Sequence, residues 1–345
     1  MARVLVTGGT GFIGRCLTQR LLDREWDVRR LLHRVQADEF VPVTDGIVGS
    51  LHDLTALREA VQGVDAVVHL AGRTLGFGRR EFFLDNATGT RNIAEACARR
   101  LTPPVLVHIS SLAAAGPSTL TQPVDESVVP RPTSHYGKSK LAGEEAVRRV
   151  ADSLPVTIVR PPGVFGPGDR HTLLMLHLAR RGFFVVAGLR TIHVSLVFVD
   201  DLCEAIVRAI GRGERLCDAS AEGSMRDRGV YHTAFERPLE LGEYARHVAR
   251  FAGAKRMRVI RVPLPLARIG TAVQELFARV QGRQTLVNFD KLREAKSRFW
   301  TCTSAKAKVH GLFDSPASFE DRLRETIHWF QATGRLESAD LAGQW

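Results

Sequence analysis

Tyr136 and Lys140 stand four residues apart in a segment of helical periodicity, so a helix there places the phenol and the ammonium on one face. A phenol with a pKa of about 10 is a poor acid–base group at pH 7 unless a positive charge stabilises its phenolate. Lys140 is suited to supply that charge. Ser111 follows an apolar run that ends at Ile109, and its hydroxyl is suited to position a substrate oxygen. These residue types predict catalysis in which Tyr136 passes a proton to or from that oxygen.

A glycine-rich turn follows the short apolar run Val4–Thr7. Gly8 permits a tight turn at the end of the expected strand, Gly11 lets the backbone approach phosphates, and Gly14 lets the next helix pack closely. The first N–H groups of that helix and its positive dipole end favour a pyrophosphate. This context predicts a dinucleotide site, and together with Tyr136 it predicts hydride transfer. The expected contacts at the turn are Gly8, Thr10, Gly11, Phe12, Ile13 and Gly14.

The end of the second expected strand indicates which dinucleotide is bound. An Asp or Glu at this point would bind the ribose hydroxyls of NAD and repel the 2′-phosphate of NADP. The chain has Leu32, His33 and Arg34 there and no acidic residue. We therefore expect His33 and Arg34 to hold the extra phosphate and NADP to be the preferred cofactor. Alternatively, Arg34 is an ordinary surface residue and NAD binds without an acidic partner.

A buried strand is expected from Ala66, and it ends in small residues. Small side chains allow close approach of a cofactor, so Leu70, Ala71 and Gly72 are predicted contacts. His69 lies in the same strand and has the chemistry of a general base. We favour instead a histidine locked by backbone hydrogen bonds at the strand end.

Up to about residue 160, short apolar runs alternate with segments of helical periodicity. Such alternation is typical of a parallel sheet with right-handed crossovers and helices on both faces. After Pro161 the pattern changes, and proline and glycine punctuate a long loop over 161–169. We therefore predict an α/β protein, a Rossmann-type doubly wound parallel sheet with a smaller, interleaved C-terminal substrate lobe.

The expected boundaries follow from this reading. Residues 1–165 form the NAD(P)-binding domain, 190–215 return to it, and 166–345 form mainly the substrate lobe. Strands are expected at Arg3–Thr7, Val28–Leu32, Gly46–Val48, Ala66–Leu70, Val105–Ile109, Val156–Val159 and Val230–Thr233. Helices are expected at Phe12–Asp23, Leu54–Val61, Phe82–Arg100, Tyr136–Ala151, Val199–Ile210, Leu241–Phe251 and Phe319–Phe330.

Composition excludes several classes of protein. The hydrophobic fraction of 44% and the charged fraction of 25% are those of an ordinary soluble protein. No apolar run reaches the roughly 18 residues of a membrane span, and no signal-peptide pattern is visible. The five cysteines are scattered and lack CxxC spacing, which favours reduced thiols over disulfides or a metal site. We expect a cytoplasmic protein without a metal.

The net charge of +11 is concentrated between Arg246 and Trp300, where 13 Lys/Arg and three Asp/Glu give +10. Such a basic region suits an anionic substrate, nucleic acid or an anionic membrane face, while a solvated basic surface is the plainer alternative. No nucleic-acid-binding motif accompanies the charge, so we expect no nucleic-acid partner. The segment Leu264–Val280 carries apolar residues at helical spacing beside Arg268 and Arg279. It can lie on a membrane, but a lid or core helix is the role we expect.

Further motifs recur along the chain, namely Thr7–Gly14, His69–Gly72, Asn86–Asn92, Ile109–Ser111, Tyr136–Lys140, Arg160–Asp169, Val197–Asp201 and the tail Trp300–Trp329. Together they resemble the successive signatures of the extended short-chain dehydrogenase/reductase family over essentially the full length. The tail is similar to members of the NAD-dependent epimerase/dehydratase and 3β-hydroxysteroid dehydrogenase-like type. The resemblance implies a Ser–Tyr–Lys triad, which falls on Ser111, Tyr136 and Lys140. It also implies a homodimer through the helices 82–100 and 136–151, and cofactor contacts from Asn86, Pro161, Gly163, Val164, Tyr136 and Lys140.

The chain departs from this family pattern at three places. One is Leu32, which replaces the acidic residue typical of the family's NAD-retaining epimerases at the end of the second strand. Where the dehydratases carry Thr-Asp-Glu, this sequence has Ser111, Leu112 and Ala113, and the missing acid pair argues against dehydratase chemistry. Where the family has Gly-Asp-Leu after the third strand, this chain has Gly49, Ser50 and Leu51. The resemblance therefore implies that Ser50, with Leu51, substitutes in part for the aspartate at the adenine.

We expect an NAD(P)-dependent oxidoreductase that interconverts a carbonyl and a secondary alcohol of a small molecule by hydride transfer. The first alternative is an NDP-sugar epimerase, in which tightly held NAD takes and returns a hydride and the basic region holds a diphosphate. The second alternative is a catalytically silent cofactor-binding subunit.

Overall fold

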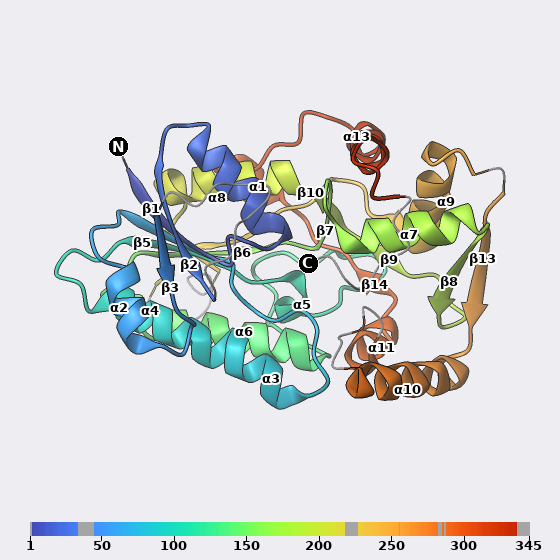
Figure 1. Cartoon of the computed structure of the whole chain (residues 1–345), viewed down its shortest axis with the longest axis horizontal. Helices are drawn as coiled ribbons and strands as arrows, with labels where there is room; N and C mark the ends of the chain where they lie inside the picture. The colour runs from blue at the N-terminus through green and yellow to red at the C-terminus, as the bar shows by residue number, and fades with distance from the viewer. Residues whose placement is uncertain are drawn as a thin grey trace.

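The computed structural model describes residues 2–33, 45–217, 227–254, 256–281, 285 and 288–336. A seven-stranded sheet lies at its centre in the order β11-β6-β5-β4-β1-β2-β3, and every neighbouring pair is parallel (Figure 1). The strands are β1 (Arg3–Thr7), β2 (Asp27–Leu32), β3 (Asp45–Val48), β4 (Ala66–His69), β5 (Val105–Ile109), β6 (Val156–Arg160) and β11 (Val230–His232). This sheet confirms the expected Rossmann-type fold.

Helices cover both faces of the sheet, which explains why the inner strands β4, β5 and β6 are buried along almost their whole length (Figure 1). One face carries α1 (Phe12–Leu22) and α8 (Val199–Arg212), and the other carries α2 (Leu54–Ala60), α4 (Thr90–Ala98) and α6 (His135–Arg148). The first layer is packed by Leu17, Leu21, Leu202 and Ile206, and the second by Leu57, Ile93 and Val147.

The order of the strands reverses between β1 and β4. From β1 the chain first builds outward to β2 and β3, then crosses back to β4, β5 and β6. In sheets of this kind the crevice beyond the carboxyl ends of the strands at the reversal is the usual ligand site. Thr7 and His69 end the two strands that border it.

The helix expected over 82–100 is not continuous, so that prediction was wrong in detail. The structure has α3 (Arg79–Phe83), a π-helical turn η1 (Leu84–Gly89) and then α4. Asn86 lies in the π turn, where its side chain bonds the backbone of Arg73 and the hydroxyl of Ser139. Single π turns often occur at functional sites, because the wider turn redirects one side chain.

The second lobe has its own hydrophobic core, packed around Phe165. Its helices are α7 (Arg170–Arg180), α9 (Leu241–Phe251) and α13 (Phe319–Ala332). Its small sheets use β7 (Gly163–Phe165), β8 (Phe183–Ala187), β9 (His193–Val194), β10 (Leu196–Phe198), β12 (Leu239–Glu240), β13 (Arg258–Val262) and β14 (Phe299–Trp300). The remaining helices are α5 (Leu112–Ala115), α10 (Leu264–Val280), α11 (Phe289–Ala295) and α12 (Ala305–Val309).

Two segments differ from the sequence expectation. The stretch 161–169 is not loop throughout, because β7 lies within it and pairs with β10 in parallel. Asp169 then starts α7 by accepting hydrogen bonds from the N–H groups of His171 and Thr172. In addition, β11 joins the main sheet beside β6, so the chain returns to that sheet after residue 215 as well.

Candidate functional site

The glycine turn after β1 leaves no room for side chains at two positions. Gly8 has a φ of +74°, and a Cβ there would lie 2.7 Å from the backbone nitrogen of Ala71. A Cβ on Gly14 would approach the carbonyl oxygen of Gly8 far inside contact distance. At the start of α1 no side chain caps the helix and its first turn carries no acid. The uncapped N–H groups and the open turn fit a dinucleotide pyrophosphate.

Ser111 and Tyr136 are brought together by the close packing of α5 and α6. Gly137 makes this possible, because a Cβ there would clash with the carbonyl oxygen of Ala113 in α5. Ser111 caps α5 by accepting a hydrogen bond from the Ala113 N–H at 3.1 Å. The phenol of Tyr136 lines the same cleft. Lys140 is buried one turn further along α6, where its ammonium donates to the carbonyl oxygen of Ile109 at 2.6 Å.

Burial shifts the pKa values of both Tyr136 and Lys140. It raises the pKa of Tyr136, while the positive charge of Lys291 and the nearby Ser111 hydroxyl act in the opposite direction. Burial lowers the pKa of Lys140 to about 8, against the opposing charge of Glu144. The cation that counteracts the effect of burial on the pKa of Tyr136 is therefore Lys291, whereas the sequence had indicated Lys140 for that role.

Helix α11 supplies residues that the sequence reasoning missed. Asp290 accepts hydrogen bonds from the N–H groups of His135 and Tyr136 at 2.8 and 2.9 Å, so it holds the start of α6. Glu294 accepts from the hydroxyl of Ser134, the cap of α6. Lys291 donates to Glu294 at 2.9 Å, and its nitrogen lies 5.3 Å from the centre of the Tyr136 ring. The charges at this helix are visible in the sequence, but nothing local indicates their partners.

A buried ion pair joins α6, which carries Tyr136 and Lys140, to the end of β6. Glu144 of α6 faces Arg160 at the end of β6, and the two side chains are 1% and 3% exposed. Arg160 donates to both carboxylate oxygens at 2.8 and 2.6 Å, and the hydroxyl of Ser110 donates to Glu144 at 2.5 Å. Burial alone raises the pKa of Glu144, but Arg160 and Ser110 outweigh it and hold the pKa below its usual value.

His69 is buried and held between two threonines. Its Nδ1 lies 2.7 Å from the hydroxyl of Thr7, and its Nε2 lies 3.0 Å from that of Thr90. Burial, together with the charge of Lys140, lowers its pKa to about 3, so the ring is neutral. The favoured structural interpretation agrees with this placement, although threonine side chains rather than backbone groups hold the ring.

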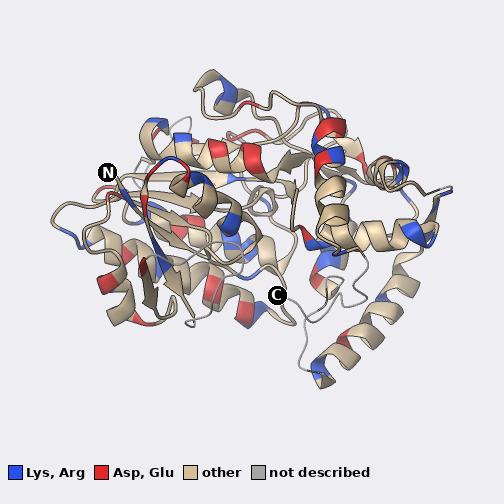
Figure 2. Ribbon diagram, turned by 45° about the horizontal axis from the view of Figure 1, so that its top comes forward, with Lys and Arg blue, Asp and Glu red and all other residues tan. Residues whose placement is uncertain are grey.

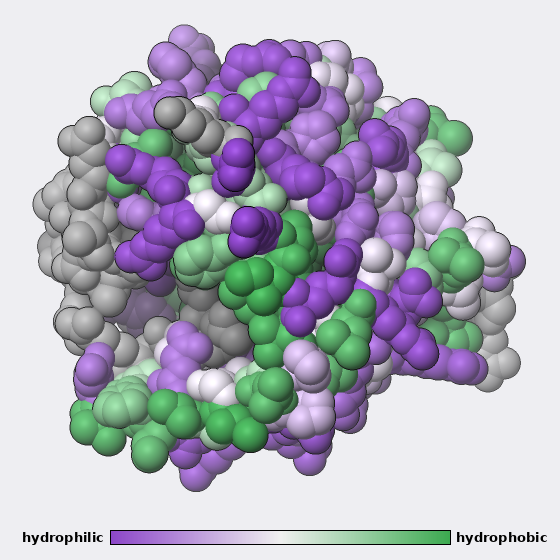
Figure 3. All heavy atoms as spheres, turned by 90° about the vertical axis from the view of Figure 1, so that its right-hand side faces the viewer, coloured by the Kyte–Doolittle hydropathy of each residue, from purple (hydrophilic) through white to green (hydrophobic). Residues whose placement is uncertain are grey.

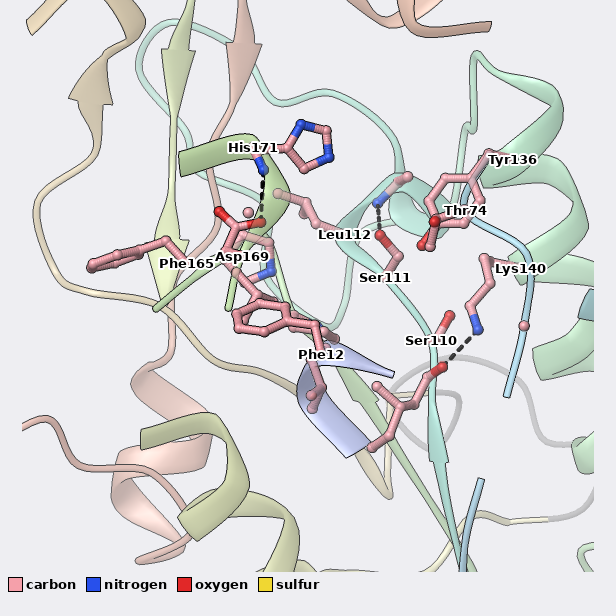
Figure 4. Close-up of a pocket in the computed structure, with 18 of the residues that line it drawn as sticks. Phe12, Thr74, Ser110, Ser111, Leu112, Tyr136, Lys140, Phe165, Asp169 and His171 are labelled. Atoms are coloured by element: carbon pink, nitrogen blue, oxygen red, sulfur yellow. Dashed lines mark hydrogen bonds between the residues drawn. The ribbon is translucent and has the colours of Figure 1, made fainter. Parts of the chain in front are cut away.

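These elements surround a cleft of about 710 Å³. Figure 4 shows Ser111, Tyr136 and Lys140 on one side of it, and Asp169 and His171 on the other. Of the residues predicted from the sequence, the cleft is lined by Gly8, Gly11, Phe12, Ile13, Gly14, Leu70, Gly72, Asn86, Ser111, Tyr136, Lys140, Pro161, Gly163 and Val164.

Five predicted residues do not line this cleft, and a sixth lies outside the described residues. Ser50 instead accepts from the N–H of His52 in its own turn, and Leu51 is buried. Ala71 donates its N–H to the hydroxyl of Thr7. Thr10 is exposed within the glycine turn, and His33 is exposed just after the end of β2. Arg34 lies outside the described residues.

Comparison with known proteins identifies the family and the fold. A family model described as the NAD dependent epimerase/dehydratase family matches residues 4–217. A ceramide reductase of Caulobacter vibrioides is 30% identical over 342 residues, which cover 96% of each chain. The 3 beta-hydroxysteroid dehydrogenase type 7 of Homo sapiens is 29% identical over 370 residues, 95% of each chain. A Thermus thermophilus UDP-glucose 4-epimerase in complex with NAD has a TM-score of 0.74 at 24% identity, covering 95% of this chain and 99% of that one. This last likeness shows the fold.

Proposed function

Because the chain belongs to the NAD-dependent epimerase/dehydratase family of extended short-chain dehydrogenases/reductases, we propose that it reduces a ketone or oxidises the matching alcohol. The observation that carries this proposal is the convergence of Ser111, Tyr136 and Lys140 on the cleft that contains the glycine turn. A nicotinamide coenzyme, when bound there, supplies or accepts the hydride.

The roles of the three side chains follow from their positions. In the reductive direction, the Tyr136 hydroxyl donates its proton to the carbonyl oxygen as the carbonyl carbon gains a hydride, and the phenolate regains a proton from water. Ser111 lines the cleft beside that phenol and is placed to hold the same substrate oxygen. Lys140 and Lys291 add positive charge that favours the phenolate.

We propose that the substrate is a neutral, largely apolar ketone. Among the described residues of the basic region 246–300, Lys291 is the cation that lines the cleft, and Glu294 neutralises it. The other described cations of this region do not line the cleft, so they cannot bind a diphosphate inside it. The relatives named for ceramide and for a steroid support an apolar substrate. The side chains that supply the apolar wall are Leu112, Phe165, Val194, Leu196, Leu241 and Trp300.

Titration of the cofactor-loaded protein tests the substrate class. We expect turnover of a steroid-sized ketone with the coenzyme consumed as a free cosubstrate, and no competition by UDP or UDP-glucose at micromolar concentration. A reaction lacking coenzyme is the control. Micromolar binding of a UDP-sugar without ketone turnover, with NAD retained through purification, would replace the reductase with the epimerase. Tight coenzyme binding without turnover of either substrate would favour the silent subunit.

We further propose that NADP is the preferred coenzyme. Leu32 is buried at the end of β2, so no carboxylate stands at the position that would repel a 2′-phosphate. NADP(H) should bind more tightly than NAD(H), and Arg34→Ala should remove most of the difference. Calorimetry with both coenzymes measures this, and Arg99→Ala, an exposed arginine on the far end of α4, is the matched control. Tighter binding of NAD by the unmodified protein would contradict the proposal.

A further inference from the structure

Helix α10 turns its hydrophobic side to solvent. Figure 3 shows green side chains side by side along the lower edge of the molecule, where this helix lies in Figure 1. The side chains concerned are each between 50 and 80% exposed and are Leu266, Ile269, Val273, Leu276, Phe277 and Val280. At about 100° per residue, they fall within an arc of roughly 100° on one side of the helix.

The opposite side of α10 is the buried one, and it carries small or polar residues. Thr271, Glu275 and Ala278 are its buried positions. An ordinary surface helix buries its apolar side and exposes its polar side. In α10 this arrangement is reversed, so the lid or core role expected from the sequence does not describe the apolar side.

Two contacts fix the orientation of α10, one at its buried side and one at its exposed flank. The carboxylate of Glu275 accepts a hydrogen bond at 2.8 Å from the N–H of Phe289, the first residue of α11. Near the end of the helix, the guanidinium of Arg279 stacks 5.0 Å from the centre of the Phe77 ring. The apolar side therefore cannot reach the core by a simple rotation of the helix.

Exposed cations outnumber acidic residues around α10, although Arg261 pairs with Glu240 at 2.9 Å and Arg279 lies 3.8 Å from Glu275. Arg268 and Arg279 are exposed on the helix, and Arg258 and Arg261 are exposed on the preceding strand β13. Glu275, the one acidic residue between 244 and 289, is 6% exposed and turned inward. In Figure 2 this helix, at the lower right, is mostly tan, with one red position along its length and blue at its lower end.

We infer that α10 lies in the surface of an anionic lipid bilayer, with its apolar side among the acyl chains and its arginines at the headgroups. An apolar stripe bordered by basic residues is the pattern of such interfacial helices. Long arginine stems can lie along the apolar layer while their charged ends reach the phosphates. A second copy of this chain fits less well, because it would bring the arginines of both copies together.

The helix lies along the bilayer and does not cross it. Its 17 residues are fewer than the roughly 20 that a span requires. No helix in the described part of the chain is long and apolar enough to span a membrane. Since α10 is bonded to α11, whose Lys291 and Glu294 line the cleft, docking would hold the cleft close to the lipid surface.

Vesicle sedimentation of the full chain tests this inference without coenzyme or substrate, so its result is independent of the proposed function. The probes are phosphatidylcholine vesicles with and without phosphatidylglycerol. We expect binding to the anionic vesicles that weakens as salt rises. The double variant Leu276→Glu/Phe277→Glu should reduce the affinity by at least about tenfold, because charged residues then replace apolar ones at the lipid. Leu101→Glu, at a fully exposed leucine outside the second lobe, is the matched control and should bind as the unmodified protein does.

Three results would overturn the inference. In the first, the unmodified protein stays in the supernatant with anionic vesicles. In the second, the double variant binds as tightly as Leu101→Glu. In the third, vesicles are not bound and analytical ultracentrifugation shows a dimer that the double variant dissociates, which would assign the apolar side to a second copy. Circular dichroism of the variants, together with their turnover of a soluble ketone, shows whether they are folded.

Discussion

Tyr136→Phe is expected to lower turnover by at least about 10²-fold, the loss typical of a removed general acid–base. The variant keeps the ring that packs against Phe82 and under Lys291, and it removes only the phenolic hydroxyl. Coenzyme affinity should change little, since the glycine turn is untouched. Steady-state kinetics with a ketone substrate, together with calorimetric titration of the coenzyme, measures both quantities.

Tyr231→Phe is the matched control for this substitution. It also removes a buried phenolic hydroxyl, but one that bonds His310 and the N–H of Glu214 at the edge strand β11, outside the cleft. Its turnover per folded molecule should stay near that of the unmodified protein, whatever it costs in stability. Near-normal turnover of Tyr136→Phe would remove this phenol from the mechanism.

Glu144→Ala is expected to lower the free energy of unfolding by about 3–5 kcal/mol, because it leaves the buried guanidinium of Arg160 without its carboxylate. Ser110 loses its acceptor in the same step. Since the pKa of Glu144 is held below its usual value, this stabilisation is present above the unfolded-state pKa and is lost as the pH falls through the folded-state pKa. Urea unfolding at neutral and acidic pH measures both effects.

The adjacent residue provides a control on the same helix. Glu145 is exposed, and Glu145→Ala should change the free energy of unfolding by no more than about 0.5 kcal/mol. The double variant Glu144→Leu/Arg160→Met should be more stable than Glu144→Ala, because it leaves no charge unpaired. If Glu144→Ala matched Glu145→Ala, the ion pair would not be a main support of the site.

The sequence was a good guide wherever a structure depends on residues near one another in the chain. The roles of Gly8 and Gly14 could be predicted because one tight turn leaves no room for their side chains. The alternation of strands and helices could be predicted from the spacing of the apolar residues. Tyr136 and Lys140 share a face because both lie on α6. The carboxyl ends of parallel strands meet at one edge, so Ser111 could be placed near them before the fold was known.

The sequence by itself therefore determined the Rossmann-type sheet, the glycine turn and the residues at the centre of the cleft, because local sterics and periodicity specify them. Only the tertiary structure decided that Asp290 holds the start of α6 from 154 residues away, since no periodic signal links such distant segments. It likewise decided the orientation of α10. An apolar stripe has the same spacing whether it faces a core or solvent, and only the packing of Glu275 against α11 turns that stripe outward.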